Sequence, residues 1–168
     1  MKPKNYYINL RNKYLPDKIK TVFILESPPV SGKYFYDNSG LTSEPLFLAM
    51  MKLLRFYPFD KEEGLKHFSS KGCLLVDATY TQVNELKNSD RNKVILNDFQ
   101  NLLGDLDSLG IEKGVELILV KKNICELLEK KLKESGFNVR NEGVMIPFPS
   151  TGQQKKFHER IEKIYQGD

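Results

Sequence analysis

Four short apolar runs, separated by longer stretches of helical periodicity, constrain the fold of this chain more than any other feature of its sequence. The runs lie at residues 21–25, 72–76, 115–120 and 144–146. Their consecutive apolar side chains are typical of strands buried on both faces. The helical stretches between them lie at residues 45–56, 62–68, 91–109 and 121–135. Strands that alternate with helices predict right-handed crossovers, and therefore an α/β fold with a mostly parallel, helix-covered sheet.

Residues at the segment boundaries agree with this alternation. Ser43 can cap the helix that follows the first strand, and Asp90 can cap the helix that follows the second. Gly110 and Gly136 stand where helices are expected to end. One further amphipathic helix is expected within residues 2–18, and another at residues 153–165.

Length and composition are those of one globular domain spanning residues 1–168. With 40% hydrophobic and 29% charged residues, the chain can bury a core without disulfides or metals. No apolar run approaches the roughly 20 residues that span a bilayer, and the N-terminal segment is too polar for a signal peptide. We therefore expect a cytoplasmic monomer that makes no membrane contact.

The sequence predicts neither a metal nor a cofactor. Cys73 and Cys125 lie in apolar runs, and two thiols are too few for an iron–sulfur cluster. His67 and His158 have no partner at the spacing of a metal site or a catalytic triad. The net charge of +4 mildly favours a polyanionic partner.

Two acidic residues directly follow apolar strands, Glu26 after the first and Asp77 after the second. Open parallel sheets bind ligands beyond the carboxyl ends of their strands, so both carboxylates are expected to face one cleft. Partial burial would fix the direction of the Glu26 side chain, as suits a catalytic group. In the alternative interpretation, Glu26 only accepts hydrogen bonds from loop amides and Asp77 only caps a loop or helix.

The loop after the first strand is rich in aromatic residues. Its segment 31–33 resembles part of a P-loop, but Ser27 and Tyr34 stand where that motif needs glycine and Ser or Thr, which excludes a nucleotide triphosphatase of that type. Tyr34, Phe35 and Tyr36 offer flat faces that suit stacking on a base. At least one of the three is expected only to pack beneath the loop.

The last predicted loop is stiffened by prolines on both sides of Phe148. Ser150 and Thr151 add hydroxyl groups, Gly152 frees the backbone, and a helix N-terminus with two lysines follows. Together these features favour a phosphate-binding turn. The alternative is an ordinary helix start with solvated lysines.

Three of these segments together resemble the loop motifs of the uracil-DNA glycosylase superfamily in order, spacing and strand context: Leu25-Glu26-Ser27-Pro28-Pro29, Asp77-Ala78-Thr79 and Phe148-Pro149-Ser150. The resemblance covers nearly the whole chain. It implies a three-layer α/β/α sandwich with a short, mostly parallel four-stranded sheet. It also implies hydrolysis of the N-glycosidic bond of a flipped base, with DNA carrying a damaged or modified base as the partner.

The same resemblance implies roles for individual residues. Glu26 would orient water and stabilise an oxocarbenium-like sugar, while Asp77 would bind the edge of the base. One aromatic residue of the segment 34–36 would stack on the base, and Ser150 and Thr151 would hold the DNA backbone. The expected substrate-binding set is completed by Ser27, Pro28, Phe148 and Gly152.

The chain departs from the family pattern at two positions. Phe148 stands where many members have the histidine that hydrogen-bonds the departing base. Asp77 replaces the usual amide, and a carboxylate, which only accepts hydrogen bonds, suits a donor-rich edge better than that of uracil. Two alternatives to a DNA glycosylase therefore stay open, a catalytically silent nucleic-acid or nucleotide-binding module and a hydrolase of small nucleosides.

Overall fold

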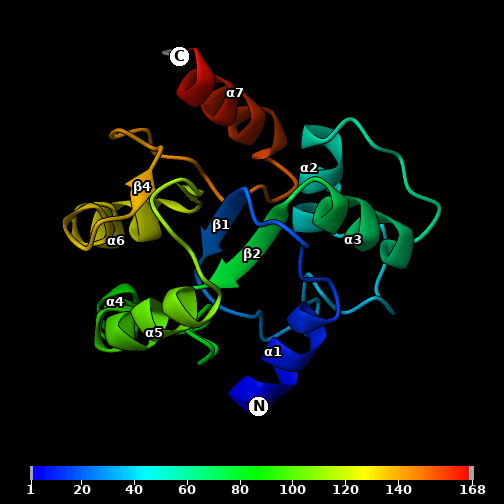
Figure 1. The fold of residues 1–168 in the computed structure, drawn as a ribbon. Helices are drawn as coiled ribbons and strands as arrows, with labels where there is room; N and C mark the ends of the chain where they lie inside the picture. Colours follow the sequence, from blue (N-terminus) through cyan, green and yellow to red (C-terminus); the bar gives the residue numbers. More distant parts are fainter. Residues whose placement is uncertain (1, 167–168) are drawn as a thin grey trace.

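The structure, a computed structural model, describes residues 2–166 and has an α/β fold built on a parallel sheet (Figure 1). Within these residues the sheet has four strands in the order β2-β1-β3-β4, and every neighbouring pair is parallel. The strands are β1 (Thr21–Leu25), β2 (Cys73–Asp77), β3 (Glu116–Leu119) and β4 (Asn138–Val139). The predicted α/β class and parallel sheet are confirmed.

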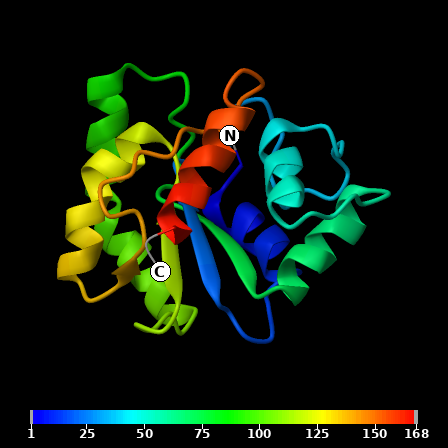
Figure 2. The ribbon, with the colours of Figure 1, turned by 90° about the horizontal axis from the view of Figure 1, so that it is seen from above.

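Helices cover both faces of this sheet. The connection from β1 to β2 and the connection from β2 to β3 run in opposite directions across the sheet, so right-handed crossovers place their helices on opposite faces. Figures 1 and 2 show α2 and α3 on one side and α4, α5 and α6 on the other, while α7 packs against α2. In the described residues the helices are α1 (Lys4–Asn12), α2 (Pro45–Leu53), α3 (Lys61–Ser70), α4 (Asn88–Asn97), α5 (Phe99–Ser108), α6 (Lys122–Glu134) and α7 (Gln154–Tyr165).

The strands are buried on both faces, as their apolar runs predict. Val22 and Ile24 of β1 are fully buried, and so are Leu74 of β2 and Leu117 of β3. Burying each such side chain contributes about 1.5–3 kcal/mol, so the helices that cover the sheet hold its strand ends in fixed positions. Within residues 2–166, no helix is long and apolar enough to cross a membrane.

The prediction of a fourth strand at residues 144–146 is wrong. Strand β4 lies earlier, at Asn138–Val139, where two residues of mixed polarity give no sequence signal. Residues 144–146 pack against the core without forming a strand ladder. Ile146 is fully buried, and its carbonyl accepts a hydrogen bond from the amide of Lys121 at 2.8 Å.

The predicted helix at residues 91–109 is two helices, α4 and α5, which meet at Asp98. The carboxylate of Asp98 accepts a 2.5 Å hydrogen bond from the Thr79 hydroxyl, which ties this break to the loop after β2. The helix predicted within residues 2–18 is shorter than that range, because α1 ends at Asn12.

The two predicted N-caps are wrong, and the two predicted helix stops are confirmed. The residue at the N-cap of α2 is Glu44 rather than Ser43, and Asp90 lies in the first turn of α4, inside the helix that it is predicted to cap. Gly110 and Gly136 follow α5 and α6 with φ of +71° and +93°, a conformation that glycine adopts without strain.

Candidate functional site

A cavity of about 380 Å³ opens at the carboxyl ends of β1, β2 and β3. Its wall includes Glu26 after β1, Asp77 at the end of β2 and Lys121 just after β3. The chain leaves β1 toward β2 and leaves β3 toward β4, so the cavity lies where the winding of the sheet reverses, the place at which open parallel sheets bind ligands. Its volume is within the range of about 300–1,000 Å³ that is typical of small-molecule sites.

The side chain of Glu26 is buried in this wall and held by three nitrogen groups. One carboxylate oxygen accepts a hydrogen bond from the ammonium group of Lys121 at 2.6 Å, and the other accepts one from the amide of Asn123 at 2.6 Å. The guanidinium of Arg91 lies 3.8 Å away. Glu26 is therefore a paired carboxylate with a fixed direction, and these partners are side chains rather than the loop amides considered from the sequence.

Lys121 is the main site residue that sequence reasoning missed. Its backbone has φ of +89°, a conformation that costs a residue other than glycine about 1–3 kcal/mol. Neighbouring structure holds it there, since its amide donates to the carbonyl of Ile146 at 2.8 Å. A signal is present in the sequence, because Lys121 directly follows an apolar strand as Glu26 does, but the residue also falls within the helix predicted at residues 121–135.

Asp77 is as deeply buried as Glu26 but has different surroundings. No described residue forms a hydrogen bond with its Oδ2 atom. Burial raises the pKa of this carboxyl group to about 8, Arg11 opposes the shift, and Asp105 and Glu26 add to it. Asp77 also lines a second cavity of about 280 Å³ beside the N-terminal helix α1, so it forms part of the wall between two cavities.

Arg11, the cation that lowers the pKa of Asp77, is paired with another acid. The guanidinium of Arg11 donates to both carboxylate oxygens of Asp105, at 2.8 and 3.0 Å, and to the hydroxyl of Tyr80 at 3.2 Å. These bonds explain why Arg11 lowers the pKa of Asp77 without overcoming the effect of burial.

The three aromatic residues after β1 have different positions. Tyr34 and Phe35 line the cavity, and the ring of Tyr34 contacts that of Tyr7 edge-on with 4.9 Å between centroids. Tyr36 is not part of the cavity wall; its hydroxyl accepts a 2.8 Å hydrogen bond from the amide of Leu75 and covers the free edge of β2. Tyr34 and Phe35 are therefore the two residues of this run that can contact a ligand in the cavity, although each is only 3% exposed.

The loop before α7 reaches the same cavity through Phe148, whose side chain is 38% exposed. The amide group of Gln154 donates to the carbonyl of Pro149 and, at 2.9 Å, to that of Pro45 at the start of α2, which fixes the loop beside the cavity. Ser150, Thr151 and Gly152 are exposed and lie outside the cavity wall.

The structure thus brings together a part of the predicted set. Ser27 lines the cavity, and its hydroxyl accepts a hydrogen bond from the amide of Val83 at 3.4 Å, whereas Pro28 is buried behind the wall. The predicted residues in the wall are Glu26, Asp77, Ser27, Tyr34, Phe35 and Phe148, and those outside it are Pro28, Tyr36, Ser150, Thr151 and Gly152.

Within residues 2–166, no group of three or more His, Cys, Asp or Glu side chains is placed to hold a metal ion. Comparisons with protein-family models, with curated proteins and with solved structures find no match for this chain. A functional conclusion therefore depends on the geometry of the cavity.

Proposed function

We propose that this chain is a DNA glycosylase-like hydrolase that cleaves the N-glycosidic bond of a deaminated or modified base flipped out of DNA. One observation carries the proposal. The Glu26 carboxylate, oriented by two 2.6 Å hydrogen bonds, lies in the wall of a cavity that is also lined by the buried residues Tyr34 and Phe35. An oriented carboxylate beside flat aromatic faces is what the hydrolysis of a stacked base requires.

In the proposed reaction Glu26 orients a water molecule against the anomeric carbon. The water oxygen forms a bond to C1′ as the C1′–N bond breaks, the bonding electron pair leaves with the base, and the water proton passes to the Glu26 carboxylate. Each carboxylate oxygen can accept more than one hydrogen bond, so the contacts to Lys121 and Asn123 leave room for water. The negative charge of Glu26 stabilises the cationic sugar.

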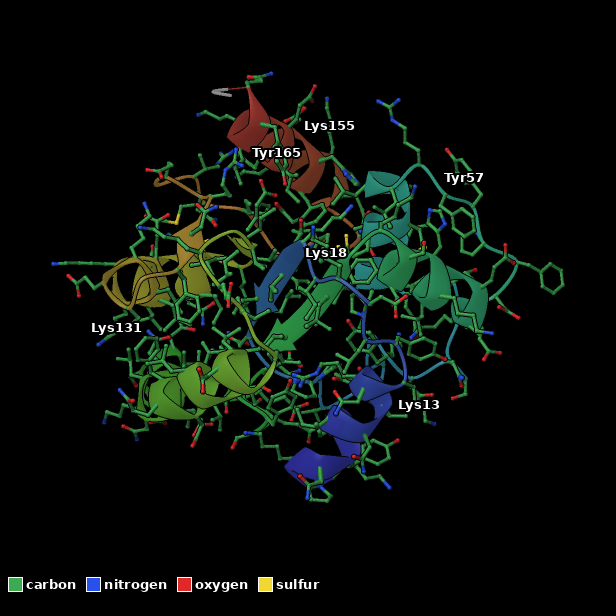
Figure 3. The ribbon with its side chains drawn as sticks, in the orientation of Figure 1. Lys13, Lys18, Tyr57, Lys131, Lys155 and Tyr165 are labelled. Atoms are coloured by element: carbon green, nitrogen blue, oxygen red, sulfur yellow. The ribbon has the colours of Figure 1, made fainter. Side chains whose placement is uncertain are left out.

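Groups that could hold DNA phosphates lie around the cavity and not inside it. Lys33 contributes to the cavity wall and is exposed, and the hydroxyl-bearing turn at residues 150–152 follows Phe148. Figure 3 shows the labelled lysines Lys13, Lys18, Lys131 and Lys155 on different parts of the fold, so the positive charge is spread over the surface. We expect few phosphate contacts and a shallow dependence of DNA affinity on salt.

The test is incubation of the purified chain with oligonucleotides that carry different lesions, followed by cleavage of any abasic sites. We expect base release from at least one lesion. Glu26→Gln should lower its rate by about 10²- to 10⁴-fold without loss of DNA binding, because the carboxylate that orients water is removed. Glu126→Gln, on an exposed face of α6, is the matched control and should release base at the normal rate.

The second candidate is a catalytically silent module that binds nucleic acid or a nucleotide. The observation that favours it is Phe148, which presents an apolar ring to the cavity where a histidine would hydrogen-bond the departing base. Lesion binding with no abasic sites from any oligonucleotide would support this candidate and overturn the hydrolase. A third candidate, a nucleoside hydrolase, would release base from free nucleosides at a rate that barely responds to salt.

A further inference from the structure

The buried acid Asp77 has no role in orienting water, yet it lies in the same cavity wall as Glu26. We propose that Asp77 is the hydrogen-bond donor to the departing base, placing its carboxyl O–H against an exocyclic oxygen, so that the substrate is an oxo base of the kind that deamination produces. This inference rests on the proposed function. It replaces the expectation, from the sequence, that Asp77 only accepts hydrogen bonds and therefore disfavours uracil.

The surroundings of Asp77 favour a neutral acid. The side chain is 4% exposed, and its Oδ2 atom has no hydrogen-bond partner among the described residues. A buried carboxylate without donors is costly, because nothing replaces the water it loses. The titratable and charged groups around Asp77 come from several elements. They are Arg11, Tyr7 and Lys4 of α1, Glu26 after β1, Tyr34 of the following loop, Tyr80 after β2, Asp105 of α5 and Lys121 after β3.

Among the charged groups that shift the pKa of Asp77, Arg11 is the cation, and it donates hydrogen bonds to Asp105, Tyr80 and Asn12. Lys121 is paired with Glu26, and the ammonium of Lys4 lies over the ring of Tyr80. The remaining charged neighbours, Asp105 and Glu26, disfavour a second negative charge. Burial and these neighbours raise the pKa of Asp77 to about 8, so the group carries its proton at neutral pH. The burial of Asp77 and the charges around it thus both favour the neutral form of its carboxyl group.

A protonated carboxyl group has one O–H donor and one carbonyl acceptor. The donor can bind an exocyclic oxygen of a base while the carbonyl accepts a neighbouring ring N–H. When the C1′–N bond breaks, negative charge develops on the base and reaches that oxygen, so the hydrogen bond strengthens in the transition state. Asp77 would therefore supply the stabilisation of the leaving group that Phe148 cannot.

The first test is the pH profile of base release from a uracil-containing oligonucleotide. The wild type should lose at least tenfold in rate between about pH 7 and about pH 9.5, because ionised Asp77 repels the departing base. Asp77→Asn keeps an N–H donor at every pH, and its profile should stay level through the same range. Asp107→Asn, exposed on α5, is the matched control and should follow the wild type.

A second test needs no catalysis. Free uracil is titrated into the protein at about pH 6 and about pH 8.5, and ¹³C NMR follows the Asp77 carboxyl carbon. We expect weaker uracil binding by the wild type at the higher pH, no such change for Asp77→Asn, and a titration midpoint near 8. A midpoint in the ordinary range of aspartate would overturn the inference even if Asp77→Asn did not fold.

The two proposals fail differently. If no lesion yields abasic sites but uracil binding follows the protonation of Asp77, the hydrolase is overturned and the donor role in binding stands. If base is released but wild type and Asp77→Asn have the same pH profile, the hydrolase stands and the inference about Asp77 is overturned.

Discussion

Glu26 and Asp77 occupy nearly equivalent positions but have opposite surroundings. Leu25 pairs with Asp77 across β1 and β2, so Glu26 lies one residue beyond that pair, at the same edge of the sheet. The exposed fractions of the two acids are 5% and 4%. Glu26 is bound by the ammonium of Lys121 and the amide of Asn123, whereas Arg11, the cation that lowers the pKa of Asp77, is bound to Asp105.

The difference shows that burial alone does not decide the state of an acid at a strand end. At the same depth, donors converge on the carboxylate of Glu26, whereas the Oδ2 atom of Asp77 has no donor among the described residues and burial raises the pKa of Asp77. In the proposed hydrolase, the two neighbouring carboxyl groups would divide the work, with Glu26 orienting water and Asp77 donating to the departing base. Three experiments on stability and titration test this difference between Glu26 and Asp77.

The largest expected effect is that of Asp77→Asn on stability. The pKa of Asp77 is raised from 3.8 to about 8 in the folded state, so the folded protein binds this proton more tightly than the unfolded chain. The contribution of Asp77 to the free energy of unfolding should therefore fall as pH rises from about 4 to about 8 and then level off, and the difference between the wild type and Asp77→Asn isolates this contribution. The Asp77→Asn variant has no proton to lose here, so we expect it to be more stable than the wild type above about pH 8 by up to about 5 kcal/mol.

Urea denaturation at a series of pH values measures this difference. Below about pH 4 both states of the wild type are protonated, and the two proteins should have similar stability. Asp107→Asn serves as the control for removing an exposed aspartate from the same region. Parallel curves for the wild type and Asp77→Asn would show that Asp77 is ionised in the folded protein.

The second largest effect on stability is expected near Glu26, where substitution of Lys121 can be compared with substitution of its neighbour Lys122. Lys121 holds the buried Glu26, whereas Lys122 has a 77% exposed side chain and pairs with Glu126 on the helix surface. Lys121→Ala should lower the free energy of unfolding by about 2–3 kcal/mol, because a buried charge loses its partner. Lys122→Ala should change it by less than about 0.5 kcal/mol. Equal effects, measured by chemical denaturation, would mean that the buried pair contributes no more than the exposed one.

The strand ends could be predicted from the sequence because apolar runs locate buried strands without any knowledge of packing. That rule placed Glu26 and Asp77 at one edge of the sheet, and the structure puts both in one cavity. It failed at Val144 and Ile146, which pack against the core, the first partly buried and the second fully buried, although no strand ladder pairs them. An apolar run in the sequence indicates that a segment is buried, but it does not indicate whether that segment forms hydrogen bonds with a neighbouring strand.

The partners of the two acids could not be predicted, because they depend on contacts between distant segments. Asn123 is 97 positions from Glu26, and Arg11 is 94 positions from Asp105. Neither spacing follows from a local pattern. The position of Tyr36 under the edge of β2 likewise follows from a contact with Leu75 and not from its place in an aromatic run.

The smallest expected effect tests why Arg11 does not ionise Asp77. Asp105→Asn removes a negative charge that raises the pKa of Asp77 and weakens the hold on the Arg11 guanidinium. Both changes favour the carboxylate, so the titration midpoint of Asp77 in ¹³C NMR should fall below about 8, and base release should decline at a lower pH than in the wild type. We expect the free energy of ionising Asp77 to change by on the order of 1 kcal/mol, since the charges of Asp105 and Asp77 interact across a partly buried region. Asp107→Asn on the same helix should leave the midpoint in place. An unchanged midpoint in Asp105→Asn would assign the raised pKa of Asp77 to burial and Glu26, without a contribution from Asp105.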